Sequence, residues 1–267
     1  MKKLAILVSA ALVSGGVIAA TPEVDVSSYN QYMQNADNNS VILMQNTELS
    51  NVKVVQGAAG RDDNVSVVDM RLQSPGTRND VDVNQDGTGT AHTSLVQIYG
   101  TSGGNDVTID QDGLQNDSWV RISADSDNNG NGYGMVDVTQ NGQENYSKIN
   151  LTGSIGSKKN TIDVDQVGDY HESDIYLNNS DLNDITSYQK GEKHDSIITL
   201  NESDSNIIDL KQKGKRSNSE IYLVASSNNS GATMGTGNGI VVSQSWDDNS
   251  YISMNNVQNS TVFVDQN

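Results

Sequence analysis

The chain repeats one short residue pattern from its middle to its end. The triplet Gln-x-Gly occurs six times, at spacings of 26, 29, 26, 23 and 23 residues. Its members are Gln85, Gln111, Gln140, Gln166, Gln189 and Gln212, with Gly87, Gly113, Gly142, Gly168, Gly191 and Gly214. Gln45, Gln244 and Gln266 follow a similar strand pattern without the glycine. Such a period is typical of solenoids, because one small unit cannot bury an apolar face alone.

Each unit contains two segments of alternating polarity joined by a turn. Apolar residues lie four and two positions before the glutamine, and again nine and eleven positions after it. Alternation at period two predicts strands, and glycine suits the tight turn between them. We therefore predict an all-β fold, a β-solenoid of about nine strand-turn-strand rungs stacked into a two-sheet, amyloid-like core.

Polar residues occupy the same phase as the apolar ones. Asparagine stands six positions before the glutamine at Asn79, Asn105, Asn160, Asn183, Asn206 and Asn238, and at Asn39 before Gln45. Five positions after it come Asn116, Asn145, His171, His194, Ser217 and Asn249. Stacked rungs bring equivalent residues to ~4.8 Å, a spacing at which amides can bond in ladders. We therefore interpret the glutamines and these asparagines as inward-facing ladder residues that serve self-assembly.

The region before the regular repeats is harder to align. Residues 46–78 contain two strand-like stretches, LSNVKVV and DDNVSVV, but no Gln-x-Gly triplet. We predict degenerate repeats over 39–78 and regular repeats over 79–267. In the Gln244 unit, Ile252 and Met254 fall one position early, so its second strand is out of phase.

The first residues have the character of an export signal. MKKLAILVSAALVSGGVIAA combines two lysines, an apolar run and small residues, which predicts a signal peptide over 1–20, followed by an N-terminal segment over 21–38. No later apolar run approaches a membrane span, so we expect an exported protein that is not integral to a membrane. The formal net charge of -18 argues against nucleic acid as a partner.

The repeat frame resembles a known family. The pattern S-x5-Q-x-G-x-x-N-x-A-x3-Q is that of curlin repeats, the subunits of curli amyloid fibres on Gram-negative bacteria. Here Asn replaces the first Ser, Ser replaces Ala seven positions after the glutamine, and Leu or Ile replaces the last Gln. The stretch SSYNQYMQNADNNSVILMQ is also similar to the segment before the repeats of the minor, nucleating subunit. The resemblance implies passage through an outer-membrane secretion apparatus, polymerisation with itself and other curlin-type subunits into extracellular fibres, and roles in adhesion and biofilm.

Two stretches suggest further chemistry beside this interpretation. DSDNNGNG at 125–132 resembles the start of a calcium-binding loop, but the twelfth position is Val136, where such loops need a glutamate. Its simpler interpretation is a solvated loop. His171 and His194 occupy equivalent positions in adjacent units, and two nitrogen ligands are too few for a closed zinc site. We expect them to stack, and protonation to weaken their rungs below about pH 6.

These observations leave three function classes. A fibre subunit without catalytic, cofactor or metal residues is favoured, because the placement of Asp, His and Ser follows the repeat rather than forming one off-pattern cluster. A monomeric surface adhesin with loose calcium binding in the loop over 123–134 is the alternative. An enzyme of the lyase type is the third, and no catalytic motif in the sequence supports it.

Overall fold

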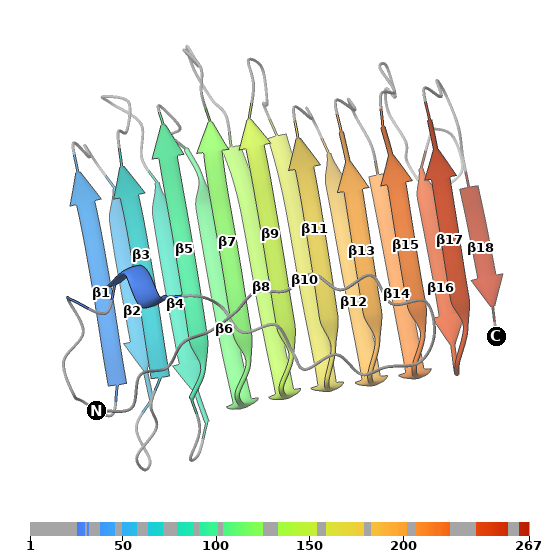
Figure 1. The fold of residues 1–267 in the computed structure, drawn as a ribbon, viewed down its shortest axis with the longest axis horizontal. Coiled ribbons are helices and arrows are strands. Elements are labelled where there is room, and N and C mark those ends of the chain that lie inside the picture. The colour runs from blue at the N-terminus through green and yellow to red at the C-terminus, as the bar shows by residue number, and fades with distance from the viewer. Residues whose placement is uncertain are drawn as a thin grey trace.

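The computed structural model describes residues 26–29, 31, 38–45, 50–57, 64–71, 79–87, 91–100, 104–124, 133–153, 159–178, 183–201, 207–224, 239–255 and 262–266. Two parallel nine-stranded sheets dominate them and confirm the predicted β-solenoid (Figure 1). Sheet A holds the odd-numbered strands: β1 (Asn38–Gln45), β3 (Asn64–Arg71), β5 (Thr93–Gly100), β7 (Asp117–Ala124), β9 (Tyr146–Gly153), β11 (Glu172–Asn178), β13 (Asp195–Leu200), β15 (Asn218–Leu223) and β17 (Asn249–Met254).

Sheet B holds the even-numbered strands and lies opposite sheet A. Its members are β2 (Asn51–Gln56), β4 (Asp80–Asp86), β6 (Asp106–Leu114), β8 (Tyr133–Gln143), β10 (Lys159–Asp169), β12 (Asp184–Glu192), β14 (Ile207–Lys215), β16 (Ile240–Ser245) and β18 (Val262–Gln266). Each even strand and the next odd strand form one rung. The described strands therefore make eight complete rungs, with the single strands β1 and β18 at the two ends.

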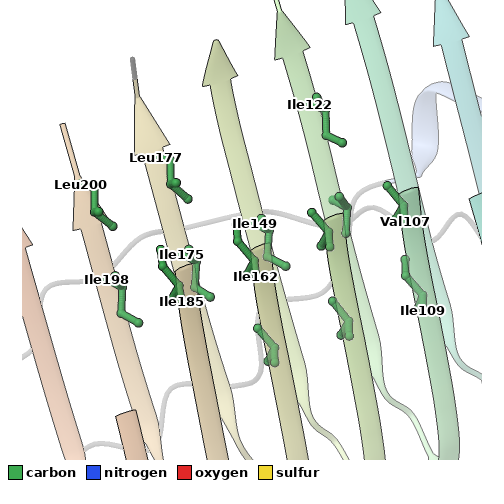
Figure 2. Close-up of a cluster of buried hydrophobic side chains, with 14 of the residues drawn as sticks. Val107, Ile109, Ile122, Ile149, Ile162, Ile175, Leu177, Ile185, Ile198 and Leu200 are labelled. Carbon is green, nitrogen blue, oxygen red and sulfur yellow. The ribbon is translucent and has the colours of Figure 1, made fainter. Parts of the chain in front are cut away.

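The rungs stack with equivalent residues in register. Gln166 of β10 pairs with Gln140 on one side and Gln189 on the other, and the turn glycines align in the same way. Buried and less buried residues alternate along the strands, as in β13 and β16. Inward apolar side chains of both sheets meet in one continuous core (Figure 2). Ser187 stands two positions before Gln189, where the other repeats have an apolar residue. It is buried in this core and accepts a hydrogen bond at 3.4 Å from the Ser173 hydroxyl of the facing sheet.

In the rungs that carry the Gln-x-Gly triplet, the turn depends on glycine for steric reasons. Gly142 has a φ of 138°, and a Cβ at this position would collide with the backbone oxygen of Gly168 in the next rung. Two residues later the chain adopts a left-handed conformation without glycine, as at Glu144 (φ 50°) and Tyr170 (φ 61°). Stacked turns leave no room beside the glycine, so the glycine column and the strand register fix each other.

The structure corrects the alignment of the first repeats. Gln45 was expected to share the glutamine frame with Asn39 six positions before it, but β1 lies in sheet A and Gln45 pairs with Arg71. The glutamine frame is also not lost over 46–78, because Gln56 of β2 pairs with Gln85. Gln56 escaped alignment because Gly57 follows it directly, without the intervening residue of the Gln-x-Gly triplet.

Turn length explains two further differences. The turn after Gln85 is two residues longer than in the regular rungs that follow, so the residue aligned with Asn116 is His92, which sequence spacing missed. The turn after Gln244 is one residue shorter, so Asn249 pairs with Asn218 and Asp248 takes the place predicted for Asn249. The shorter turn brings the second strand of this unit back into register, so that Ile252 pairs with Ile221 and Met254 pairs with Leu223.

A short N-terminal element packs on the outer surface of sheet A. The 3₁₀ helix η1 (Ser27–Tyr29) crosses this sheet near β1 and β3 (Figure 1). Tyr29 donates a hydrogen bond to Asp69 at 2.8 Å and accepts one from Gln97 at 2.9 Å. The N-terminal segment over 21–38 thus contributes a docked residue, while the signal peptide over 1–20 lies outside the described residues. Within the described part, no helix has the length and apolarity of a membrane span.

Candidate functional site: a polar ladder along the interior

Nine glutamines form one continuous hydrogen-bonded chain through the solenoid. Each Nε2 donates to the Oε1 of the glutamine in the following rung, from Gln56 to Gln266. The eight distances are 2.9, 2.9, 2.8, 2.9, 2.9, 3.0, 3.2 and 3.1 Å. The ladder therefore runs through Gln85, Gln111, Gln140, Gln166, Gln189, Gln212 and Gln244, all of which are buried.

The second amide proton of each glutamine binds a backbone carbonyl on the facing strand of the preceding rung. Gln166 donates to the Tyr146 carbonyl at 2.9 Å, and Gln189 donates to the Glu172 carbonyl at 2.8 Å. Buried amides are costly unless both donors and the acceptor are satisfied, and this arrangement satisfies them. All nine amides point the same way along the stack, so the ladder has a direction.

A second column next to the glutamines links consecutive rungs through side chain to backbone bonds. The Asn116 side-chain oxygen accepts the Asn145 backbone N–H at 3.1 Å, and that of Asn145 accepts the His171 N–H at 3.0 Å. Asn64 bonds the His92 N–H in the same way at 2.9 Å. Each of these three asparagines thus supplies the acceptor that the next turn needs.

The histidines of this column fill the same role with a ring nitrogen. Nδ1 of His171 accepts the backbone N–H of His194 at 3.3 Å, and Nδ1 of His194 accepts that of Ser217 at 3.2 Å. Their Nε2 atoms therefore carry the proton and donate to the Val167 and Lys190 carbonyls. The two rings stack with centroids 4.9 Å apart and planes 5° apart.

Burial sets the charge state of this histidine pair. It lowers the pKa of His171 to about 4, with the neighbouring His194 adding to the effect, and it lowers the pKa of His194 as well. A neutral ring is also what the hydrogen bonds require, because a protonated Nδ1 could not accept the next backbone N–H. His171 and His194 are therefore uncharged at physiological pH and accept hydrogen bonds through Nδ1.

The asparagine column at the far end of the rung is only partly described. Asn79 accepts both the backbone N–H and the side-chain amide of Asn105, at 3.0 and 2.9 Å, and Asn183 is buried. Asn160 pairs in the backbone with Gly134 of β8. Asn206 and Asn238 lie outside the described residues.

The serine column behaves differently from the amides. Ser94 donates to Ser66 at 3.0 Å, but the hydroxyls of Ser118, Ser147, Ser196 and Ser219 are buried without a hydrogen-bond partner. An unsatisfied buried hydroxyl opposes folding. At these four positions the small serine side chain therefore fills the space inside the rung and adds no hydrogen bond between rungs.

Charged residues lie on the outer surfaces. Burial and the stacked carboxylates of neighbouring rungs raise the pKa values of Asp137 and Asp163. Two basic residues of the Gln212 rung form ion pairs within the stack, Lys211 with Asp209 and Lys215 with Glu192, both at 3.0 Å. Among the described residues no group of three or more His, Asp or Glu side chains could hold a metal ion. The loop 125–132 lies outside them, and Val136 is buried in the core.

Comparison with known proteins gives no relative from which a role could be transferred. No protein-family model, no curated protein and no solved structure matches the chain.

Proposed function

We propose that the chain is a secreted structural subunit of a curli-like amyloid surface fibre, which assembles by stacking rung on rung and supports adhesion and biofilm matrix. The continuous glutamine ladder carries this proposal. Its amides are satisfied within the stack by identical amides one strand spacing away, which is also the arrangement of amyloid cores. The resemblance of the repeat to curlin sequences points the same way.

The edges of both sheets support assembly rather than a monomeric role. The described ends of the stack present parallel strands whose backbone groups pair on one side only. An unpaired strand edge with a matching column of side chains is a template for another strand. Other curlin-type subunits and a secretion apparatus are partners within the same proposal.

Fibre formation by the purified chain tests the proposal. Protein lacking residues 1–20 should form thioflavin-positive fibres that diffract at ~4.8 Å along the fibre and ~10 Å across it. In the producing cell, deletion of the gene should remove surface amyloid staining. Gln166→Glu should slow assembly, whereas Val167→Glu, which adds the same charge one residue further on, should slow it much less.

A monomer at every concentration would contradict the proposal. A calcium-dependent rise in melting temperature without fibres would instead favour the adhesin that the sequence leaves as its alternative. The two outcomes are distinguished in one set of samples, with calcium or a chelator present.

A further inference from the structure

The two ends of the stack are incomplete in complementary ways. At one end β1 extends sheet A beyond the first complete rung, and at the other end β18 extends sheet B beyond the last. β1 therefore has no facing strand among the described residues. Its core-phase residues Ile42 and Met44 are 45% and 40% exposed, whereas the residues they pair with, Val68 and Met70, are fully buried.

β18 lacks a facing strand in the same sense. Val262 and Val264 pack against the end of the core but stay partly exposed. Both residues are in the core phase, because they pair with the buried Ile240 and Val242. Each end thus leaves apolar surface that one further strand of the opposite sheet would cover.

The residues at the two ends match position by position. The register runs unbroken from β1 to β17 and from β2 to β18, so each interior column has one residue at either end of the stack. The six end pairs are Ser40 with Ser250, Ile42 with Ile252, Met44 with Met254, Val52 with Val262, Val54 with Val264, and Gln56 with Gln266. The apolar columns vary between these ends, since the column that starts at Met44 and ends at Met254 holds Ile98, Leu177 and Leu200.

The glutamine ladder adds a direction to this match. Gln266 uses one amide proton on the Asn249 carbonyl, at 3.2 Å, and the ladder direction leaves its other proton for a following rung. At the opposite end Gln56 donates to Gln85, so its Oε1 faces away from the stack. A donor end and an acceptor end fit each other, whereas two like ends do not.

We infer that subunits join head to tail through a shared rung, in which β18 of one copy and β1 of the next face each other across a common core. β17 then pairs with β1 of the next copy, β18 pairs with its β2, and Gln266 donates to its Gln56. The partner is a second copy of this chain. The inference rests on the proposed function and adds which strands meet, in which register and in which direction.

Engineered cysteines test the junction directly, because the chain has no cysteine of its own. Asp265 and Val55 are exposed, outward residues that end one column of sheet B. Where β18 pairs with β2 of the next copy, their Cα atoms lie ~4.8 Å apart, within the range that a disulfide bridges. Fibres from an equal mixture of Asp265→Cys and Val55→Cys should give covalent dimers on oxidation with copper phenanthroline.

The single variants provide the controls. Each assembled alone should give no dimer, because head-to-tail stacking separates identical residues by a whole subunit, ~40 Å. Dimers from a single variant, or none from the mixture, in fibres that otherwise form normally would overturn the shared rung and leave the proposed function standing. Absence of fibres from the wild-type chain would overturn both.

A charge in the shared core gives an independent test. Ile42→Lys places an ammonium where the free subunit leaves the side chain half exposed and the shared rung buries it. The soluble variant should keep the wild-type circular dichroism and melting temperature, but need ~100-fold more protein to assemble. Val55→Lys, at a residue 42% exposed on the outer surface, is the matched control and should assemble nearly as wild type.

Val264→Lys repeats the test from the other end, so the inference does not depend on one variant folding. An equal effect of Ile42→Lys and Val55→Lys on the assembly concentration would contradict the shared core.

Discussion

The histidine pair makes the stability of the stack depend on pH, with a sign that the structure fixes. The pKa of His171 is about 4 in the fold and about 6.5 in an unfolded chain. The unfolded chain therefore binds more protons between these values, and stability falls as the pH is lowered through that window. From linkage alone, His171 should cost about 2 kcal/mol at pH 5 and about 3 kcal/mol at pH 4, relative to pH 8.

Acidic groups near the histidines act in the opposite direction. Burial, with Asp195 and Asp174 nearby, raises the pKa of Glu172 to about 7, and burial with Asp174 and Glu220 nearby raises that of Asp195 to about 6. Burial also raises the pKa of Asp174. These groups bind protons in the fold first, so their contribution to stability falls as the pH rises. The wild-type profile is the sum of both effects.

Replacing the two histidines by asparagine separates their contribution to the pH dependence from that of the acidic groups. Asn is the ordinary residue of this column, as at Asn116 and Asn145, and its side-chain oxygen can accept the same backbone N–H without titrating. The double variant His171→Asn, His194→Asn should lose at least ~2 kcal/mol less stability than the wild type between pH 8 and pH 5. The assay is urea unfolding of dilute, unassembled protein at each pH. Parallel pH profiles for the two proteins would refute the reasoning.

Three further substitutions test the interior columns, each by urea unfolding of the monomer. Gly142→Ala should destabilise by about 3 kcal/mol or more, because its Cβ has no space in the stacked turn. Gln140→Leu should cost about 2–4 kcal/mol, because it leaves ladder groups buried without partners. Ser147→Ala should be neutral or stabilise by up to about 1 kcal/mol, because it removes an unsatisfied hydroxyl.

Matched variants sharpen two of these tests. Gly239→Ala meets only ordinary contacts and should stay within about 0.5 kcal/mol of the wild type. Ser94→Ala removes a hydroxyl that donates at 3.0 Å and should cost about 1 kcal/mol. Equal effects within either glycine or serine pair would contradict the role given to that column.

The sequence predicts the strands well because the alternation of apolar and polar residues determines which side chains face the core. Two-residue alternation places Val164 and Ile175 inside, and a slip of one residue would turn the whole strand outward. Turn lengths have no such constraint, since a loop can gain or lose a residue at small cost. That is why His92 and Gln56 escaped alignment, although both occupy ladder columns.

The contacts of η1 could not be predicted for a different reason. Tyr29 meets Asp69 across 40 residues on the outer surface, where no repeat or alternation constrains a partner. The direction of the glutamine ladder was also beyond sequence reasoning. Composition places amides in a column, but only their geometry shows that every one donates toward β18.

The stacked register also has a mechanical consequence. Pulling on the β18 end would load the hydrogen bonds of one rung at a time. The chain would therefore detach from the stack rung by rung, and each detached rung would free the residues of one repeat. The stack is least regular between β14 and β16, where the Gln212–Gln244 bond is 3.2 Å long and Trp246 stands where the preceding rungs have glycine. A filament built from such subunits would lengthen rung by rung under load before it broke, and each released rung would take up part of the applied work.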